Sequence, residues 1–288
     1  MSETTAGIRF ALLAMVCFAA QDALSKHLAH SYPIPFIVMI RYWAFALFVI
    51  VLAMRQPGGI RAALRTKMPV LQIVRGVMLV LQILVFVNGL YLLGMSPMMA
   101  LFSLYPLLIT FLAIPILGES VGWRRVLAVG TGFLGVLVIL RPGLGVFDEK
   151  AVIGLIAALG LALYSIFTRI VTRADGSSGP ALFYTGVVGA VTISLIGPFY
   201  WTPMAPADWG WIAVLSIAGL TGHSLLIRAY QASEAVRIQP FTYLQMVFGV
   251  ILGWTIFGEP VDPWMVIGMG MIITAGLYAL WREMRAGS

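Results

Sequence analysis

Polar side chains lie inside long apolar segments of this 288-residue chain, where an uncompensated polar group is costly. Gln82 and His223 lie near the centres of segments 70–92 and 209–231. An amide can hydrogen-bond the amino or carboxylate group of a substrate, and a histidine can also carry a proton. The rival interpretation for Gln82 is a hydrogen bond between helices, and for His223 a packed histidine. Both interpretations remain open for each residue.

A second set of polar, aromatic and proline residues lies in segments 97–117 and 237–257. Proline removes a backbone hydrogen bond and frees a carbonyl one turn earlier, so it permits a kink. Proline is also frequent in membrane helices without any special role. The candidates in this set are hinges at Pro106 and Pro240 and substrate contacts at Tyr105, Tyr243 and Gln245.

Three further residues are candidates for substrate contact. Phe86 is on the same helical face as Gln82, one turn later. Trp43 lies centrally in its segment, away from the interfaces where tryptophan usually gathers, so it could stack on a ligand or pack in the core. Arg41 lies one to two turns inside the same segment and could bind a carboxylate or extend outward to the interface.

Asp22 is the clearest acid inside an apolar segment. One hypothesis is that its carboxylate carries a coupling proton. The alternative is an i,i+4 ion pair with Lys26 at the outer end of the first segment, and the spacing favours this pair. Glu119 and Glu259 end apolar segments, which favours capping or gate contacts over substrate binding.

The composition explains why these groups must be positioned by membrane helices. The chain is 61% hydrophobic and 10% charged, whereas soluble proteins carry about 25% charged residues. This excludes a soluble enzyme and a disordered chain, and one cysteine excludes a disulfide scaffold. No metal-ligand spacing and no cofactor motif in a suitable context is present, so we expect neither a metal nor a cofactor.

Ten apolar segments are long enough to cross a bilayer as helices. They are 8–28, 35–54, 70–92, 97–117, 122–140, 151–171, 180–200, 209–231, 237–257 and 263–281. With both termini in the cytoplasm, only four of the 18 basic residues fall on the outer side, namely Lys26, Arg41, Arg141 and Lys150. This bias predicts that both termini are cytoplasmic. No nucleic-acid partner is expected, because the basic residues form no face or stripe.

The chain repeats itself at an offset of 140 residues. Leu117-Gly118-Glu119-Ser120 corresponds to Phe257-Gly258-Glu259-Pro260, and both end one segment and open the next. The repeat predicts an all-α membrane protein of ten transmembrane helices in two five-helix halves, residues 1–145 and 146–288. Because five is odd, the second half enters the membrane inverted, as is typical of secondary transporters. The internal duplication also makes a working monomer plausible.

Ten segments in two halves, each with a Gly-Glu pair closing its fourth helix, resemble the EamA-type exporters of the drug/metabolite transporter superfamily. Within it the chain is most similar to bacterial aromatic amino-acid exporters. The resemblance covers the whole chain. It implies an inner-membrane exporter of amino acids or similar small metabolites. It also implies a cavity lined mainly by the third, fourth, eighth and ninth helices.

The leading hypothesis is therefore a secondary transporter for amino acids with aromatic or other apolar side chains, working by alternating access. No nucleotide-binding domain is present, so transport runs down a gradient or couples to an ion. One alternative is an exporter of drugs or organic cations, which would use an unpaired intramembrane carboxylate. Another is a membrane enzyme acting on lipid-linked substrates, which would need paired acids or metal ligands.

Overall fold

The structure is a computed structural model that describes residues 3–118, 123–141, 149–232 and 239–286. All regular structure in these ranges is helical, without a strand. The helices are α1 (Glu3–Ala29), α2 (Ile34–Arg55), α3 (Gly59–Ala63), α4 (Pro69–Leu93), α5 (Met95–Phe102), α6 (Tyr105–Leu117), α7 (Trp123–Leu140), α8 (Ala151–Asp175), α9 (Gly179–Ser194), η1 (Gly197–Tyr200), α10 (Pro206–Ala232), η2 (Gln239–Thr242), α12 (Tyr243–Phe257) and α13 (Pro263–Ala286).

Within the described ranges, six helical stretches are long and apolar enough to cross a membrane. They correspond to α1, α2, α4, α5 with α6, α8 and α10. Four shorter apolar helices lie in α7, α9, α12 and α13. The predicted all-helical membrane class is thereby confirmed, whereas ten complete spans and an inverted repeat remain predictions.

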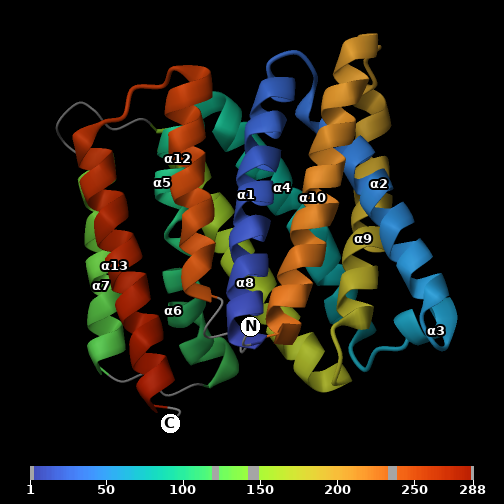
Figure 1. The fold of residues 1–288 in the computed structure, drawn as a ribbon, viewed down its shortest axis with the longest axis horizontal. Helices are drawn as coiled ribbons and strands as arrows, with labels where there is room; N and C mark the ends of the chain where they lie inside the picture. Colours follow the sequence, from blue (N-terminus) through green and yellow to red (C-terminus); the bar gives the residue numbers. More distant parts are fainter. Residues whose placement is uncertain (1–2, 119–122, 142–148, 233–238, 287–288) are drawn as a thin grey trace.

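The helices stand side by side in one bundle (Figure 1). The α7–α13 pair forms one edge, α2 and α9 form the other, and α1, α4, α8 and α10 lie between them. The start of α1 and the end of α13 lie at the same end of the bundle. We call this the terminal end and the opposite one the far end.

The main contacts between predicted halves are reciprocal. The first predicted helix packs on the eighth (α1 on α10), and the third packs on the sixth (α4 on α8). The second packs on the seventh (α2 on α9), the fourth on the ninth (α5 on α12) and the fifth on the tenth (α7 on α13). If each helix is replaced by its counterpart in the other predicted half, the pair of first and eighth becomes the pair of sixth and third, and the whole set of pairs is unchanged. A two-fold relation between the predicted halves requires such a set.

The glycines of the repeated Gly-Glu motif end two helices in the same way. Gly118 follows α6 and Gly258 follows α12, and both are left-handed, with φ of 67° and 63°. Glycine adopts this conformation without the steric cost that a side chain imposes, which is why it commonly closes helices. The local sequence therefore fixes where these two helices stop.

Candidate functional site: a polar cavity between four helices

A cavity lies between α1, α2, α4 and α10. Its volume is about 30 Å³, which is room for about two water molecules. Its polar lining consists of Gln21, Arg41, Tyr42, Ser216 and His223. The first, second, third and eighth predicted helices therefore supply its walls. The fourth and ninth, which the family resemblance implied, contribute none of its lining residues.

Two buried polar atoms on this lining have no hydrogen-bond partner: Gln21 Oε1 and Tyr42 Oη. Their residues are only 5% and 3% exposed. Leaving such an atom unpaired costs about 1–3 kcal/mol, and so buried polar groups are nearly always hydrogen-bonded to protein or water. These two atoms are therefore available to bind water or a polar ligand in the cavity.

Aromatic rings hold His223 in the cavity wall. Its imidazole stacks on Phe45, with ring centroids 5.6 Å apart, and meets the edge of Phe18 at 5.0 Å. Arg41 lines the same cavity from α2. Of the substrate contacts predicted from the sequence, Arg41 and His223 are the two on this cavity lining. They place a cation beside a stacked aromatic platform.

Asp22 is buried next to this cavity on α1, and its partner differs from the one favoured by the sequence. Gln245 Nε2 donates to Asp22 Oδ2 at 2.8 Å, across a sequence separation of 223 residues. Lys26 instead pairs with Glu259. The predicted Asp22–Lys26 ion pair is therefore wrong. The i,i+4 spacing permits such a pair, but Glu259 from the other half of the chain takes the lysine.

Gln82 and Phe86 of α4 are not among the residues that line the cavity. Gln82 Nε2 approaches the backbone oxygen of Ala157 in α8 at 3.5 Å, a long hydrogen bond between helices. Phe86 is buried, with its ring centroid 4.6 Å from that of Phe102 in α5. Tyr105 continues this aromatic row, 5.3 Å beyond Phe102.

The remaining predicted residues are dispersed. Tyr243 is buried, with an unpaired hydroxyl, at a point where a methyl group on Gly276 would overlap it. Trp43 is 43% exposed, and its indole N–H donates to Ser194 Oγ at 2.9 Å. Pro106 is at the start of α6, just after the break that separates it from α5, and the backbone of Pro240 lies in η2 before α12. The two proline positions thus coincide with interruptions of the predicted helices.

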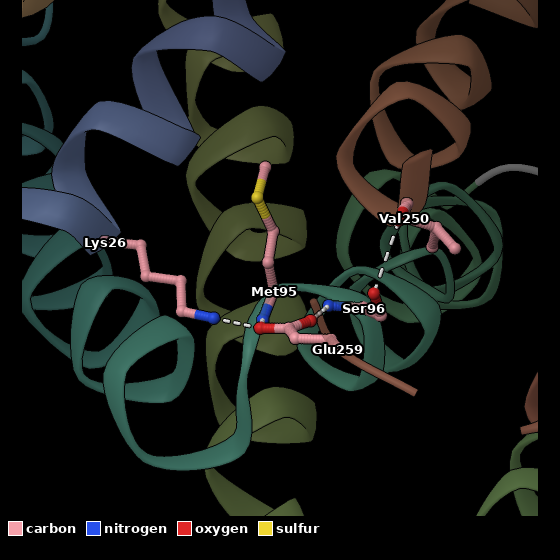
Figure 2. A network of polar contacts seen from close by, with 5 residues as sticks. All are labelled: Lys26, Met95, Ser96, Val250 and Glu259. Atoms are coloured by element: carbon pink, nitrogen blue, oxygen red, sulfur yellow. Dashed lines mark hydrogen bonds and ion pairs between the residues drawn. The ribbon is translucent and has the colours of Figure 1, made fainter. Parts of the chain in front are cut away.

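A second polar site lies at the far end, around Glu259 (Figure 2). Its carboxylate accepts the backbone N–H groups of Met95 and Ser96, both at 2.7 Å, and pairs with Lys26. These N–H groups open α5, whose N-cap residue Gly94 has no side chain to cap it. Gly94 has φ 93°, and a Cβ there would come within 2.9 Å of the carboxylate. Glu259 therefore caps α5 from the opposite half of the chain.

The surroundings of Glu259 act on its pKa in opposite directions. Partial burial alone would raise the pKa of this carboxyl group, but the hydrogen bonds from Lys26 and from two backbone N–H groups outweigh burial. The pKa therefore lies below the ordinary value of 4.5, and Glu259 is charged at neutral pH. Glu119, its predicted counterpart, lies outside the described residues.

Arg75 forms a third polar site. It lies in the second turn of α4, toward the terminal end of the bundle. Its guanidinium donates to Tyr164 Oη at 3.0 Å, Thr168 Oγ1 at 3.1 Å and Gln72 Oε1 at 2.8 Å, and to the backbone oxygen of Ala181. Arg75 is 1% exposed. It thus ties α4 to α8 and α9. In the sequence, Arg75 is one of the basic residues that fall on the predicted cytoplasmic side, although its depth in the apolar segment and Gln72 one turn earlier are signals of burial.

The described residues contain no cluster of three or more histidine, cysteine or acidic side chains that could hold a metal ion. The three polar sites offer hydrogen bonds, ion pairs and aromatic contacts. These interactions bind and release small molecules.

Comparison with known proteins agrees with this inference. The S-adenosylmethionine uptake transporter of Rickettsia felis is 27% identical over 285 residues, 98% of this chain and 95% of that protein. The pseudopaline exporter CntI of Pseudomonas aeruginosa is 27% identical over 281 residues, 96% of each chain. The riboflavin transporter of Rhizobium johnstonii is 26% identical over 288 residues, 99% of this chain and 94% of that protein.

A solved crystal structure of a protein shares the fold, with a TM-score of 0.64 and 19% identity over 99% of both chains. The profile of the EamA-like transporter family matches residues 5–141 and 150–281, which is nearly the whole chain. With its apolar helices, the chain is a multi-pass membrane protein and a transporter, and it belongs to the EamA-like transporter family.

Proposed function

We propose that this protein exports amino acids with aromatic or other apolar side chains, or similar small metabolites, across the inner membrane by alternating access. The observation that carries the proposal is the cavity between α1, α2, α4 and α10. It combines the Arg41 cation, an aromatic platform and two unpaired buried polar atoms.

The lining matches the two ends of such a substrate. Arg41 supplies a fixed positive charge with a planar set of donors, which suits a carboxylate. The unpaired hydroxyl of Tyr42 can donate to the same group. The Phe45–His223 stack offers a flat surface for an aromatic or aliphatic side chain. A substrate with a carboxylate and an apolar side chain therefore finds a partner for both parts.

The size of the cavity supports a change of conformation during transport. About 30 Å³ is far below the roughly 300–1,000 Å³ of typical metabolite sites. A substrate must therefore enter when α1, α2, α4 and α10 have moved apart. The interruptions at Pro106 and Pro240 supply hinges for such movement in this proposal. Gln82, Gln245, Tyr105, Tyr243, Phe86 and Trp43 remain proposed substrate contacts of a more open state.

Two inverted five-helix halves would provide the two alternating states. The reciprocal pairing of helices supports this arrangement, as does the match of the family profile to residues 5–141 and 150–281. The two termini lie at the same end of the bundle (Figure 1), which supports the proposal that both are cytoplasmic. Relatives from Rickettsia are named uptake transporters and relatives from Pseudomonas aeruginosa are named exporters, and export is the direction that we propose for this protein.

The test is flux in liposomes containing the purified protein. We expect labelled phenylalanine or tryptophan to cross the membrane faster than in protein-free liposomes. Arg41→Met and His223→Ala should each reduce this flux at least about tenfold, because each variant removes a charge-assisted hydrogen bond or a stacked contact with the substrate. Thr131→Val is the control, because Thr131 is exposed on α7 and bonds its own helix. Amino-acid flux that survives both cavity variants would remove this cavity as the site.

A second candidate function is export of organic cations. One observation favours it: Asp22 hydrogen-bonds neutral Gln245 and has no ion pair with Lys26, which leaves a buried carboxylate that could bind a cation or carry a coupling proton. The same liposomes distinguish the two functions when a quaternary ammonium dye replaces the amino acid, with and without a pH gradient. Dye flux without amino-acid flux would overturn the leading proposal.

A further inference from the structure

We infer that the amide oxygen of Gln21 binds the ammonium group of the substrate, so that this site selects zwitterions over carboxylates that lack an amino group. The inference rests on the proposed function and adds a binding residue to the same cavity. Gln21 is not among the substrate contacts expected from the sequence.

The first step is the orientation of the Gln21 side chain. Its amide interacts with the carboxylate of Asp22, the next residue along α1. A carboxylate attracts the NH₂ group of an amide, and this places Gln21 Oε1 on the other side, where it has no partner. Gly219 of α10 makes room for this oxygen, because a methyl group there would overlap it. The oxygen is thus held in a defined position on the cavity lining.

The second step is the kind of group that this oxygen needs. An amide oxygen only accepts hydrogen bonds, so its missing partner is a donor. The neighbouring negative charge of Asp22 makes a positively charged donor more favourable than a neutral one. An ammonium group meets both conditions. A carboxylate at the same place would be repelled.

The third step is the distribution of charge across the cavity. Gln21 and its neighbour Asp22 give the α1 wall a negative character, whereas Arg41 gives the α2 wall a positive one. Asp22 and Arg41 attract each other across this region. A zwitterion can align its own dipole with these walls, with its carboxylate at Arg41 and its ammonium at Gln21. A substrate with one charge leaves one wall unpaired.

The experiment compares three probes in liposomes containing the wild-type protein: phenylalanine, 3-phenylpropionate and phenethylamine. The second lacks the ammonium group and the third lacks the carboxylate. We expect phenylalanine to have a KM at least about tenfold lower than either analogue, since one charged hydrogen bond is lost in each case. Equal transport of phenylalanine and 3-phenylpropionate by the wild type would overturn the inference while leaving transport of carboxylates intact.

A variant locates the effect at Gln21. Gln21→Met keeps the length of the side chain but removes the acceptor, so we expect the KM for phenylalanine to rise about tenfold or more while that for 3-phenylpropionate stays within about twofold. Gln56→Met is the matched control, because Gln56 is exposed after the end of α2. An unchanged phenylalanine KM in Gln21→Met would refute the assignment. If Gln21→Met does not fold, the three wild-type KM values still test whether the site selects zwitterions. Absence of flux for all three probes would instead refute the proposed function.

Discussion

The contact between Glu259 and the start of α5 yields a quantitative prediction about stability. Glu259→Gln removes the charge that pairs with Lys26 and leaves one amide oxygen for the two N–H groups of Met95 and Ser96. Breaking a buried ion pair costs about 3–5 kcal/mol because the remaining charge stays buried. The Glu259 side chain retains 13% exposure, so we take the lower end, about 3 kcal/mol.

This loss of free energy is measurable as a change in Tm. A destabilisation of 1 kcal/mol lowers Tm by about 2–4 °C in chains of 150–250 residues, and by the smaller value in a longer chain. We therefore expect Glu259→Gln to lower Tm by about 6 °C, followed by tryptophan fluorescence in detergent. Glu149→Gln is the matched control, because Glu149 is exposed before α8 and such substitutions change stability by about 0.5 kcal/mol at most.

A double-mutant cycle separates the ion pair from the capping of α5. Lys26→Met removes the other charge, so Glu259→Gln in that background should cost about 1–2 kcal/mol less than in the wild type. The remaining cost would report the lost hydrogen bonds to the start of α5. A Tm for Glu259→Gln within 1 °C of the Glu149→Gln control, about the noise expected of a surface change, would refute the reasoning.

Three further predictions follow from the described contacts. The pKa of Glu259 lies below 4.5 in the folded protein, so the charged carboxylate stabilises the fold fully above that pH, and this stabilisation is lost as the pH falls through the lowered pKa. When the pH is lowered from about 5 to 3, the Tm of the wild type should therefore fall more than the Tm of Glu259→Gln. Arg75→Met should lower stability by about 2–4 kcal/mol in detergent unfolding, because it removes the donor that four oxygens share, and the bonds to two of them, Gln72 Oε1 and the backbone oxygen of Ala181, are buried. Arg75→Lys should restore only part of this loss. Gly189→Ala should destabilise by about 1–3 kcal/mol, because its methyl group would overlap the Tyr42 ring, whereas Gly130→Ala meets no atom within 4 Å and should leave Tm unchanged or slightly higher.

Much of the fold could be predicted from the sequence because the determinants are local. A helix in lipid satisfies its own backbone, so long apolar runs are helical and proline or glycine marks their interruptions. Segment 97–117 illustrates the limit. The sequence predicts one helix over this segment with a candidate hinge at Pro106, whereas the described chain ends α5 at Phe102 and begins α6 at Tyr105. How far a proline disrupts a helix depends on which neighbours satisfy the freed groups.

The candidate site could be predicted only in part. Arg41 and His223 stand out in the sequence because polar residues are rare inside apolar segments, and both line the cavity. Gln21 is not among the contacts expected from the sequence, since sequence alone does not say which acceptor lacks a donor. That property emerges only when every other group near it has been placed.

The sequence by itself determined the membrane class, the approximate helix ends and the internal repeat of the Gly-Glu motif. Only the tertiary structure decided the partners: Lys26 with Glu259, Asp22 with Gln245, and Arg75 with α8 and α9. The physical reason is that hydropathy and backbone hydrogen bonding act within a segment. Ion pairs and cavities, in contrast, depend on how each helix is rotated and packed against helices that are distant in the chain.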